Sequence, residues 1–173
     1  DSIRNVVLTG HGGSGKTALA EAMLFKCGLT DRMGNTADGN TVCDFDAEEI
    51  RRKISINSAV VNAVWKDTKI NVIDAPGQFD FVGGMYEGMR AAESVIITVN
   101  GKDSVCPGTI KAYNLACKLN KARMLAVTCM EVENSDFYKV HTDLKIAFGP
   151  SVCPIVVPFD KHGPVEAYIN LLT

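Results

Sequence analysis

The stretch "GHGGSGKT" at residues 10–17 constrains the fold of this chain more than any other feature. It matches the pattern GxxxxGK[ST] and lies between an apolar run at residues 3–9 and a segment of near-helical periodicity. In a strand–loop–helix unit of this kind, backbone N–H groups and the helix N-terminus surround phosphate oxygens. We expect Lys16 to neutralise the β- and γ-phosphates of a nucleotide and the Thr17 hydroxyl to coordinate Mg²⁺. The remaining expected contacts of this phosphate loop come from His11, Gly12, Gly13, Ser14 and Gly15.

Strand-like and helix-like segments alternate along the rest of the chain. The pattern predicts strands over 58–65, 69–74, 94–99, 123–128 and 153–157, and helices over 81–92, 109–119 and 135–147. Such alternation predicts a parallel sheet, and the short link between the first two of these strands predicts an antiparallel edge hairpin. The expected fold class is α/β, a P-loop NTPase three-layer sandwich with a mostly parallel sheet, one antiparallel edge strand and helices on both faces. The loops after Thr9, Ile73, Val99 and Val127 should meet at one rim of this sheet.

Residues 28–52 interrupt this regular alternation. The segment is polar, contains several glycines and aspartates, and has only weak periodicity. We therefore expect a long mobile loop of the kind that carries function.

Composition narrows the class of protein and its partners. The formal net charge of −2 creates no general attraction for nucleic acid or anionic membrane, so we expect no DNA binding. The apolar runs are far shorter than the roughly 20 residues of a membrane helix and no signal pattern is visible, which predicts a cytoplasmic protein. We also expect a monomer. The six scattered cysteines form no CxxC pair, and we expect reduced thiols that bind no metal.

A second phosphate-site element follows in "NVIDAPG" at residues 71–77. The apolar strand ends in Asp74, whose carboxylate is placed to hold Mg²⁺ through a water at the rim of the sheet. Gly77 completes the pattern DxxG, and its backbone N–H can approach a γ-phosphate closely because no side chain intervenes.

With these motifs in this order, and with "GKDSVCPGT" and "NSDFYKV" after them, the chain resembles the GTPase domain of bacterial translation elongation factor G. The similarity runs from about Asn5 to Phe159, and the phosphate loop is most similar to that of the elongation factor G-like members. The resemblance implies a translational GTPase fold, Mg²⁺ and GTP or GDP as ligands, and the ribosome as the partner that activates hydrolysis.

The resemblance also assigns two residues of the segments that sense the γ-phosphate. Ser55 stands where the family has a threonine that reaches Mg²⁺ and the γ-phosphate, and a serine hydroxyl can still coordinate the metal. Gln78 stands where the family usually has the histidine that orients the attacking water, a task that glutamine performs in Ras-type GTPases. The expected catalytic set is Gln78, Lys16 and Gly77. Both assignments compete with a plainer role as solvent-facing polar residues.

The base-binding motif is the largest departure from the family. Where the family has Asn-Lys-x-Asp, this chain has Thr128, Cys129, Met130 and Glu131. The resemblance implies that Glu131 replaces the double acceptor for guanine, with Thr128 making a shorter-range contact and Cys129 unable to cover the ring as lysine does. Weakened contacts of this kind are worth roughly 1–3 kcal/mol each, so the preference for guanine stays open.

The last residues allow two readings. By resemblance, residues 151–173 begin a subdomain inserted before the final base-contacting strand, so that the chain is a single P-loop GTPase domain (residues 1–173) truncated inside that domain. Alternatively, residues 153–157 form a closing strand and residues 164–172 a closing helix of a compact domain.

Three functions remain after these observations. The first is a translational-GTPase domain that binds Mg²⁺-GTP and hydrolyses it slowly unless the ribosome orders its switch segments. The second is a degenerate nucleotide-binding module with weak or no guanine specificity, acting in regulation or with the ribosome. The third is a small-molecule kinase that uses ATP, against which the sequence "DAPG" and the absence of an arginine-rich lid both argue.

Overall fold

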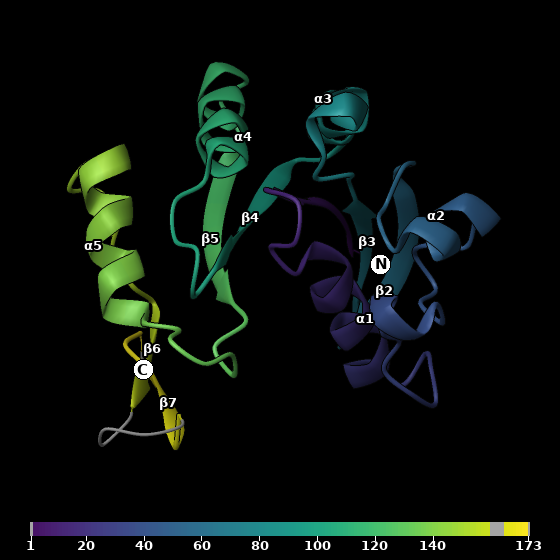
Figure 1. Cartoon of the computed structure of the whole chain (residues 1–173), viewed down its shortest axis with the longest axis horizontal. Coiled ribbons are helices and arrows are strands. Elements are labelled where there is room, and N and C mark those ends of the chain that lie inside the picture. The colour runs from purple at the N-terminus through teal and green to yellow at the C-terminus, as the bar shows by residue number, and fades with distance from the viewer. Residues whose placement is uncertain (1, 160–164, 173) are drawn as a thin grey trace.

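A five-stranded sheet forms the centre of the computed structural model, which describes residues 2–159 and 165–172 (Figure 1). The strands follow one another in space as β2-β3-β1-β4-β5. β2 runs antiparallel to β3, and the other neighbouring pairs are parallel. The predicted fold class is therefore confirmed, including the antiparallel edge strand. The bounds are β1 (Ser2–Gly10), β2 (Ala59–Trp65), β3 (Thr68–Asp74), β4 (Ser94–Asn100) and β5 (Ala122–Thr128).

Helices cover both faces of the sheet because successive strand residues point to opposite sides. Val7 of β1 packs in a cluster with the apolar sides of α3 and α4, whereas Leu8 packs in another cluster with α1. Val99, near the end of β4, packs against α5. The helices are α1 (Lys16–Lys26), α3 (Val82–Ala91, preceded by the 3₁₀ turn η2, Phe79–Phe81), α4 (Pro107–Lys118) and α5 (Phe137–Phe148). In the described part of the chain, none of them is long and apolar enough to cross a membrane.

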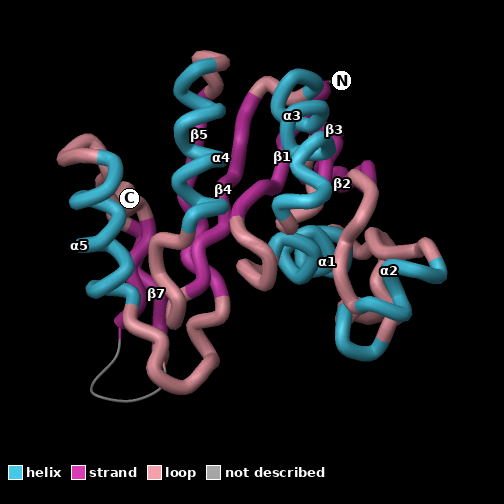
Figure 2. Tube along the Cα trace, turned by 45° about the horizontal axis from the view of Figure 1, so that its top comes forward, coloured by secondary structure: helices cyan, strands magenta, loops and turns pink. Residues whose placement is uncertain are grey.

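The segment predicted as a long mobile loop is largely irregular, but it contains two short helical elements that the prediction missed. They are the 3₁₀ turn η1 (Thr36–Asp38) and α2 (Ala47–Arg52). The Asp46 side chain caps the start of α2, and Glu49 returns a contact to the backbone N–H of Asp46, which is a capping box. Figure 2 shows α2 and its flanking loops beside α1, on the side of the molecule away from α5, as does Figure 1.

The C-terminal residues form a separate antiparallel pair, β6 (Val156–Phe159) and β7 (Ala167–Asn170), next to α5. The strand predicted at 153–157 therefore starts later and does not join the central sheet. The closing helix considered for residues 164–172 is also wrong over its described part, and Pro164 lies outside the described residues. Val157 faces the β-favouring Ile169 across the hairpin, and this pairing replaces the helix.

The strand register brings the functional segments to one rim of the sheet. Ala59, at the start of β2, lies directly opposite Asp74, at the end of β3. On the other side of β1, Gly10 lies opposite Thr98 of β4. The segment that leads into β2, the segment that leaves β3 and the phosphate loop thus converge, as the sequence predicts for the loops of such a sheet.

Candidate nucleotide-binding site

The phosphate loop wraps around the N-terminus of α1. Gly15 precedes the helix with φ 76° and ψ 22°, a left-handed conformation that glycine adopts without steric cost. No side chain of the described residues caps this helix end, so its first N–H groups stay available to an anion. The Ser14 hydroxyl donates to the carbonyl of His11 at 2.7 Å and lies 2.6 Å from the Thr98 hydroxyl. The loop is therefore held in shape by β4 as well as by its own backbone.

Lys16 is buried at the centre of this loop, with 6% of its surface exposed. Its ammonium group donates to the carbonyl oxygen of His11 at 2.8 Å and lies against Gly77. Burial lowers the pKa of Lys16 to about 8, although the charges of Asp74 and Asp44 oppose the shift. The side chain is thus a poorly solvated cation, and a bound anion would stabilise its charge.

Three side chains predicted to bind a metal come together beside Lys16. The Thr17 hydroxyl donates to Asp74 Oδ2 at 2.6 Å and lies 3.2 Å from the Ser55 hydroxyl. Burial raises the pKa of Asp74 to about 6, and the hydrogen bond from Thr17 and the charge of Lys16 oppose the shift. The second carboxylate oxygen of Asp74 is buried and has no hydrogen-bond partner among the described residues.

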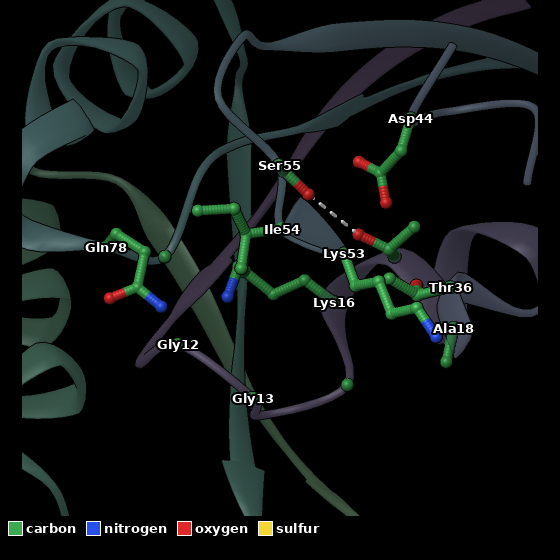
Figure 3. Close-up of a pocket in the computed structure, with 13 residues that line it drawn as sticks. Gly12, Gly13, Lys16, Ala18, Thr36, Asp44, Lys53, Ile54, Ser55 and Gln78 are labelled. Atoms are coloured by element: carbon green, nitrogen blue, oxygen red, sulfur yellow. Dashed lines mark hydrogen bonds between the residues drawn. The ribbon is translucent and has the colours of Figure 1, made fainter. Parts of the chain in front are cut away.

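Asp44 is a further acidic residue of this site that sequence reasoning missed. It is 4% exposed, and its carboxyl group points toward the hydroxyl group of Ser55 (Figure 3). Burial raises the pKa of Asp44, and its Oδ2 has no hydrogen-bond partner within the described part of the chain. No local motif marks this residue, because it reaches the site through the path of a long irregular segment.

A cavity of about 220 Å³ lies between these groups. The phosphate loop forms its floor, the segment that precedes β2 forms one wall, and the residues after β3 form another (Figure 3). The cavity brings together segments that are far apart in the sequence but meet at the rim of the sheet. Its lining comprises Gly12, Gly13, Gly15, Lys16, Thr17, Ala18, Thr36, Asp44, Lys53, Ile54, Ser55, Gly77 and Gln78.

Two buried glutamates hold the wall formed by residues 28–57 in place. Glu21 of α1 accepts hydrogen bonds from the backbone N–H groups of Val42 and Cys43, at 2.6 and 3.1 Å. Glu49 of α2 accepts from Ile56 and Asn57 with one oxygen, both at 2.9 Å, and from Asp46 with the other at 3.2 Å. Each carboxylate is 1% exposed and replaces backbone partners that an irregular segment lacks.

Gln78 lies directly against the phosphate loop. A Cβ atom added to Gly12 would come within 2.7 Å of Gln78 Nε2, so the amide of Gln78 would have to shift if residue 12 had a side chain. Gln78 itself is exposed to solvent at the mouth of the cavity. The amide is therefore close to the predicted γ-phosphate position and accessible to water.

The residues predicted to contact the base lie on the other side of the phosphate loop. The Thr128 hydroxyl donates to the carbonyl of Ser14 at 2.8 Å, so the end of β5 is tied to the phosphate loop despite the short side chain. Cys129 has φ 55°, and its sulfur lies near Gly15. Glu131 is exposed and does not line the cavity. Asn100 adds a second tie, which the sequence did not predict, by donating to the carbonyl of Gly13 at 3.3 Å.

Comparison with known families gives one match over most of the chain. The family described as "Elongation factor Tu GTP binding domain" matches residues 1–164. A crystal structure of a protein from Thermus thermophilus superposes with a TM-score of 0.92 at 33% sequence identity. The superposition covers 98% of this chain and 25% of that one.

Relatives with similar sequences include translation factors. The "Elongation factor G-like protein" of Mycobacterium tuberculosis is 34% identical over 156 residues, which is 90% of this chain and 22% of the relative. "Ribosome-releasing factor 2, mitochondrial" of Culex quinquefasciatus is 31% identical over 172 residues, or 99% of this chain and 23% of the relative. The chain thus spans less than a quarter of the length of these relatives.

Proposed function

This chain belongs to the family of elongation factor Tu GTP binding domains, and we propose that it binds Mg²⁺-GTP in the cavity described above and hydrolyses it to GDP. The observation that carries the proposal is the position of Lys16, a buried cation at the floor of a cavity lined by hydroxyl and carboxyl groups. A triphosphate bound to the N–H groups of the phosphate loop would supply the negative charge that compensates this buried ammonium group. Hydrolysis then acts as a ribosome-linked switch in translation, a role supported by the names of the relatives.

The oxygen atoms beside Lys16 suit Mg²⁺, which prefers oxygen ligands. The carboxylates of Asp74 and Asp44 each keep one buried oxygen without a hydrogen-bond partner in the described part of the chain. A divalent cation would satisfy such oxygens and relieve the repulsion between the two carboxylates. Thr17, Ser55 and Asp74 would hold the ion, and bound there it would neutralise phosphate charge during the reaction.

Other residues of the site would orient the attacking water, stabilise the developing charge and sense the γ-phosphate. Gln78, which leans on Gly12, orients the water that attacks the γ-phosphate, because its amide both donates and accepts hydrogen bonds. Lys16 and the backbone N–H of Gly77 stabilise the charge that develops on the phosphate oxygens. Ser55 and Gly77 stand in the segments that flank the neighbouring strands β2 and β3, so loss of the γ-phosphate would remove the contacts that these two residues make with it.

A titration of the purified chain with GTP, GDP, ITP, XTP and ATP in excess Mg²⁺ tests the binding. Tight binding of GTP with weaker ITP supports recognition of the exocyclic amine of guanine by Glu131. The exposed position of Glu131 favours a second candidate, a nucleotide-binding module of weak guanine specificity, which would bind these triphosphates alike. Absence of binding by all of them would contradict both.

Single-turnover hydrolysis tests the assignment of Gln78. We expect Gln78→Ala to leave the affinity for GTP within about twofold and to slow hydrolysis by about a hundredfold. Asp80→Asn, an exposed neighbour outside the cavity, is the matched control and should hydrolyse GTP at the unchanged rate. Lys16→Ala should abolish binding. Unchanged turnover in the Gln78 variant would remove this residue from the mechanism.

A further inference from the structure

Lys53 is a second lysine on the wall of the cavity, at the opposite end from Lys16. In Figure 3 its side chain extends toward Ala18 and Thr36, whereas the ammonium group of Lys16 lies on the side of Gln78. Neither the glycine-rich motif nor DxxG includes this residue.

The backbone of Lys53 suggests that its side chain has a specific role. It ends α2 with φ 57° and ψ 39°, a left-handed conformation in which glycine is the favoured residue. A residue held in such a conformation beside a cavity is reason to look for a function. Here a long cationic side chain replaces the glycine that would fit the turn better, and it lines the cavity.

The charge of Lys53 is free, unlike the charges of its two neighbours. Arg51 and Arg52 both pair with Glu48, on the exposed side of α2. The Lys53 side chain makes no hydrogen bond or ion pair in the described ranges 2–159 and 165–172. The cavity therefore has one buried cation at one end and one unpaired, exposed cation at the other.

The order of groups along the cavity identifies the part of a ligand that would meet Lys53. Given the function proposed above, Gly77 and Gln78 mark the γ-phosphate end, next to Lys16. The phosphate chain then runs along the N–H groups of the loop toward the first turn of α1, where Ala18 lies. We propose that the Lys53 ammonium group binds the α-phosphate of the nucleotide.

This assignment gives Lys53 a different task from Ser55 on the same segment. The α-phosphate is present in both GTP and GDP, so Lys53 contributes equally to the affinity for the two nucleotides. Ser55 stands near the γ-phosphate end, among the groups expected to bind Mg²⁺. The segment before β2 thus keeps one contact after hydrolysis, which should slow the release of GDP.

Calorimetric titration of the 173-residue chain and its variants with GTP and GDP, in excess Mg²⁺, tests the proposal. We expect Lys53→Gln to weaken binding of both nucleotides by the same factor, about tenfold. Lys53→Gly should weaken binding to the same extent while raising the melting temperature, because it removes the left-handed strain with the charge. A purely structural role predicts a higher melting temperature with unchanged affinity. The matched control is Lys66→Gln, since Lys66 is also a left-handed lysine, with φ 53°, in the turn between β2 and β3 and outside the cavity.

The outcomes separate this inference from the proposed function. A loss confined to GTP would assign Lys53 to the γ-phosphate and overturn the proposal. Unchanged affinity of Lys53→Gln, with normal binding by the parent chain, would overturn it alone. Failure of the parent chain to bind either nucleotide would overturn the proposed function and this assignment together.

Discussion

At the scale of the residue, Lys16 shows how burial prepares a side chain for a ligand. Its ammonium group has one hydrogen bond, to the carbonyl of His11, and its pKa is lowered to about 8. The pKa of the neighbouring Asp74 shifts in the opposite direction, since burial raises it to about 6. In the free chain each of the two groups therefore keeps its charge less readily than it would in water, and a phosphate anion and a divalent cation would relieve them respectively.

The lowered pKa of Lys16 leads to an expected pH dependence of nucleotide affinity. Below about pH 8 the ammonium group is already charged, so the affinity should not change with pH through the titration of this residue. Above that pH the free lysine becomes neutral while the bound phosphate requires the charged form, so affinity should fall by up to about tenfold per pH unit.

Calorimetry in buffers of different ionisation enthalpy measures the proton taken up on binding. The number of protons taken up should be close to zero at a pH well below the pKa of Lys16, and it should rise as the pH is increased past that pKa. A GDP affinity that stays constant from about pH 7 to about pH 9 would contradict the assignment of the shifted group.

Sequence reasoning finds those site residues whose positions follow from short motifs. Lys16, Thr17 and Asp74 lie at fixed offsets from glycines and from the ends of strands, and the parallel pairing of β1 with β3 brings Asp74 to the phosphate loop. Asp44 and Lys53 have no such signal, because their positions depend on how residues 28–57 pack against α1. Tertiary contacts, not local pattern, therefore limit the prediction of this site.

At the scale of the element, α2 and the loops beside it show what a local signal can still reveal. Asp46 followed by Glu49 is a capping-box pattern, which was the available sequence signal for the helix that begins at Ala47. The C-terminal hairpin had a weaker signal. Tyr168 and Ile169 favour a strand, but only the pairing with β6 decides between a strand and a helix there.

Glu49 should be the main anchor of the segment that precedes β2. Replacement by Gln keeps one acceptor oxygen but loses charge-assisted hydrogen bonds to partly buried backbone N–H groups. We expect Glu49→Gln to lower the free energy of unfolding by about 1–3 kcal/mol in urea titrations. We also expect faster proteolytic cleavage within residues 28–57 under native conditions, because this segment loses its anchor first.

The adjacent Glu48 provides the matched control. It pairs with Arg51 and Arg52 on the exposed surface, where ion pairs contribute little to stability. Glu48→Gln should leave both the urea midpoint and the proteolysis rate unchanged. Equal effects of the two substitutions would show that the buried hydrogen bonds of Glu49 are not what holds the segment.

At the scale of the whole molecule, stability should be distributed unevenly between the central sheet and the C-terminal hairpin. β1 has a hydrogen-bonded strand on each side, and Val7 and Leu8 are fully buried on opposite faces. β6 and β7 form a two-stranded sheet, and the side chains of β7 are exposed. We propose that this hairpin is a separate unit that contributes little to the stability of the central sheet.

Native-state hydrogen exchange tests this distribution. Amides of Val7 and Leu8 should exchange at least about a hundredfold more slowly than those of β7, because they open only when the central sheet unfolds. Exchange of β7 amides as slow as that of β1 would contradict the proposal and would place the hairpin within the same cooperative unit.

The pairing of Ala59 with Asp74 has a mechanical consequence for signalling by this molecule. The segment that contains Ser55 and the segment that contains Gly77 adjoin this same pair of strand residues, and no helix lies between the two strands. This pair of residues is therefore an attachment point that both segments share. If loss of the γ-phosphate displaces one of these segments, we expect the paired strands to pass part of that displacement to the other, so a single hydrolysis event would change two patches of the surface together.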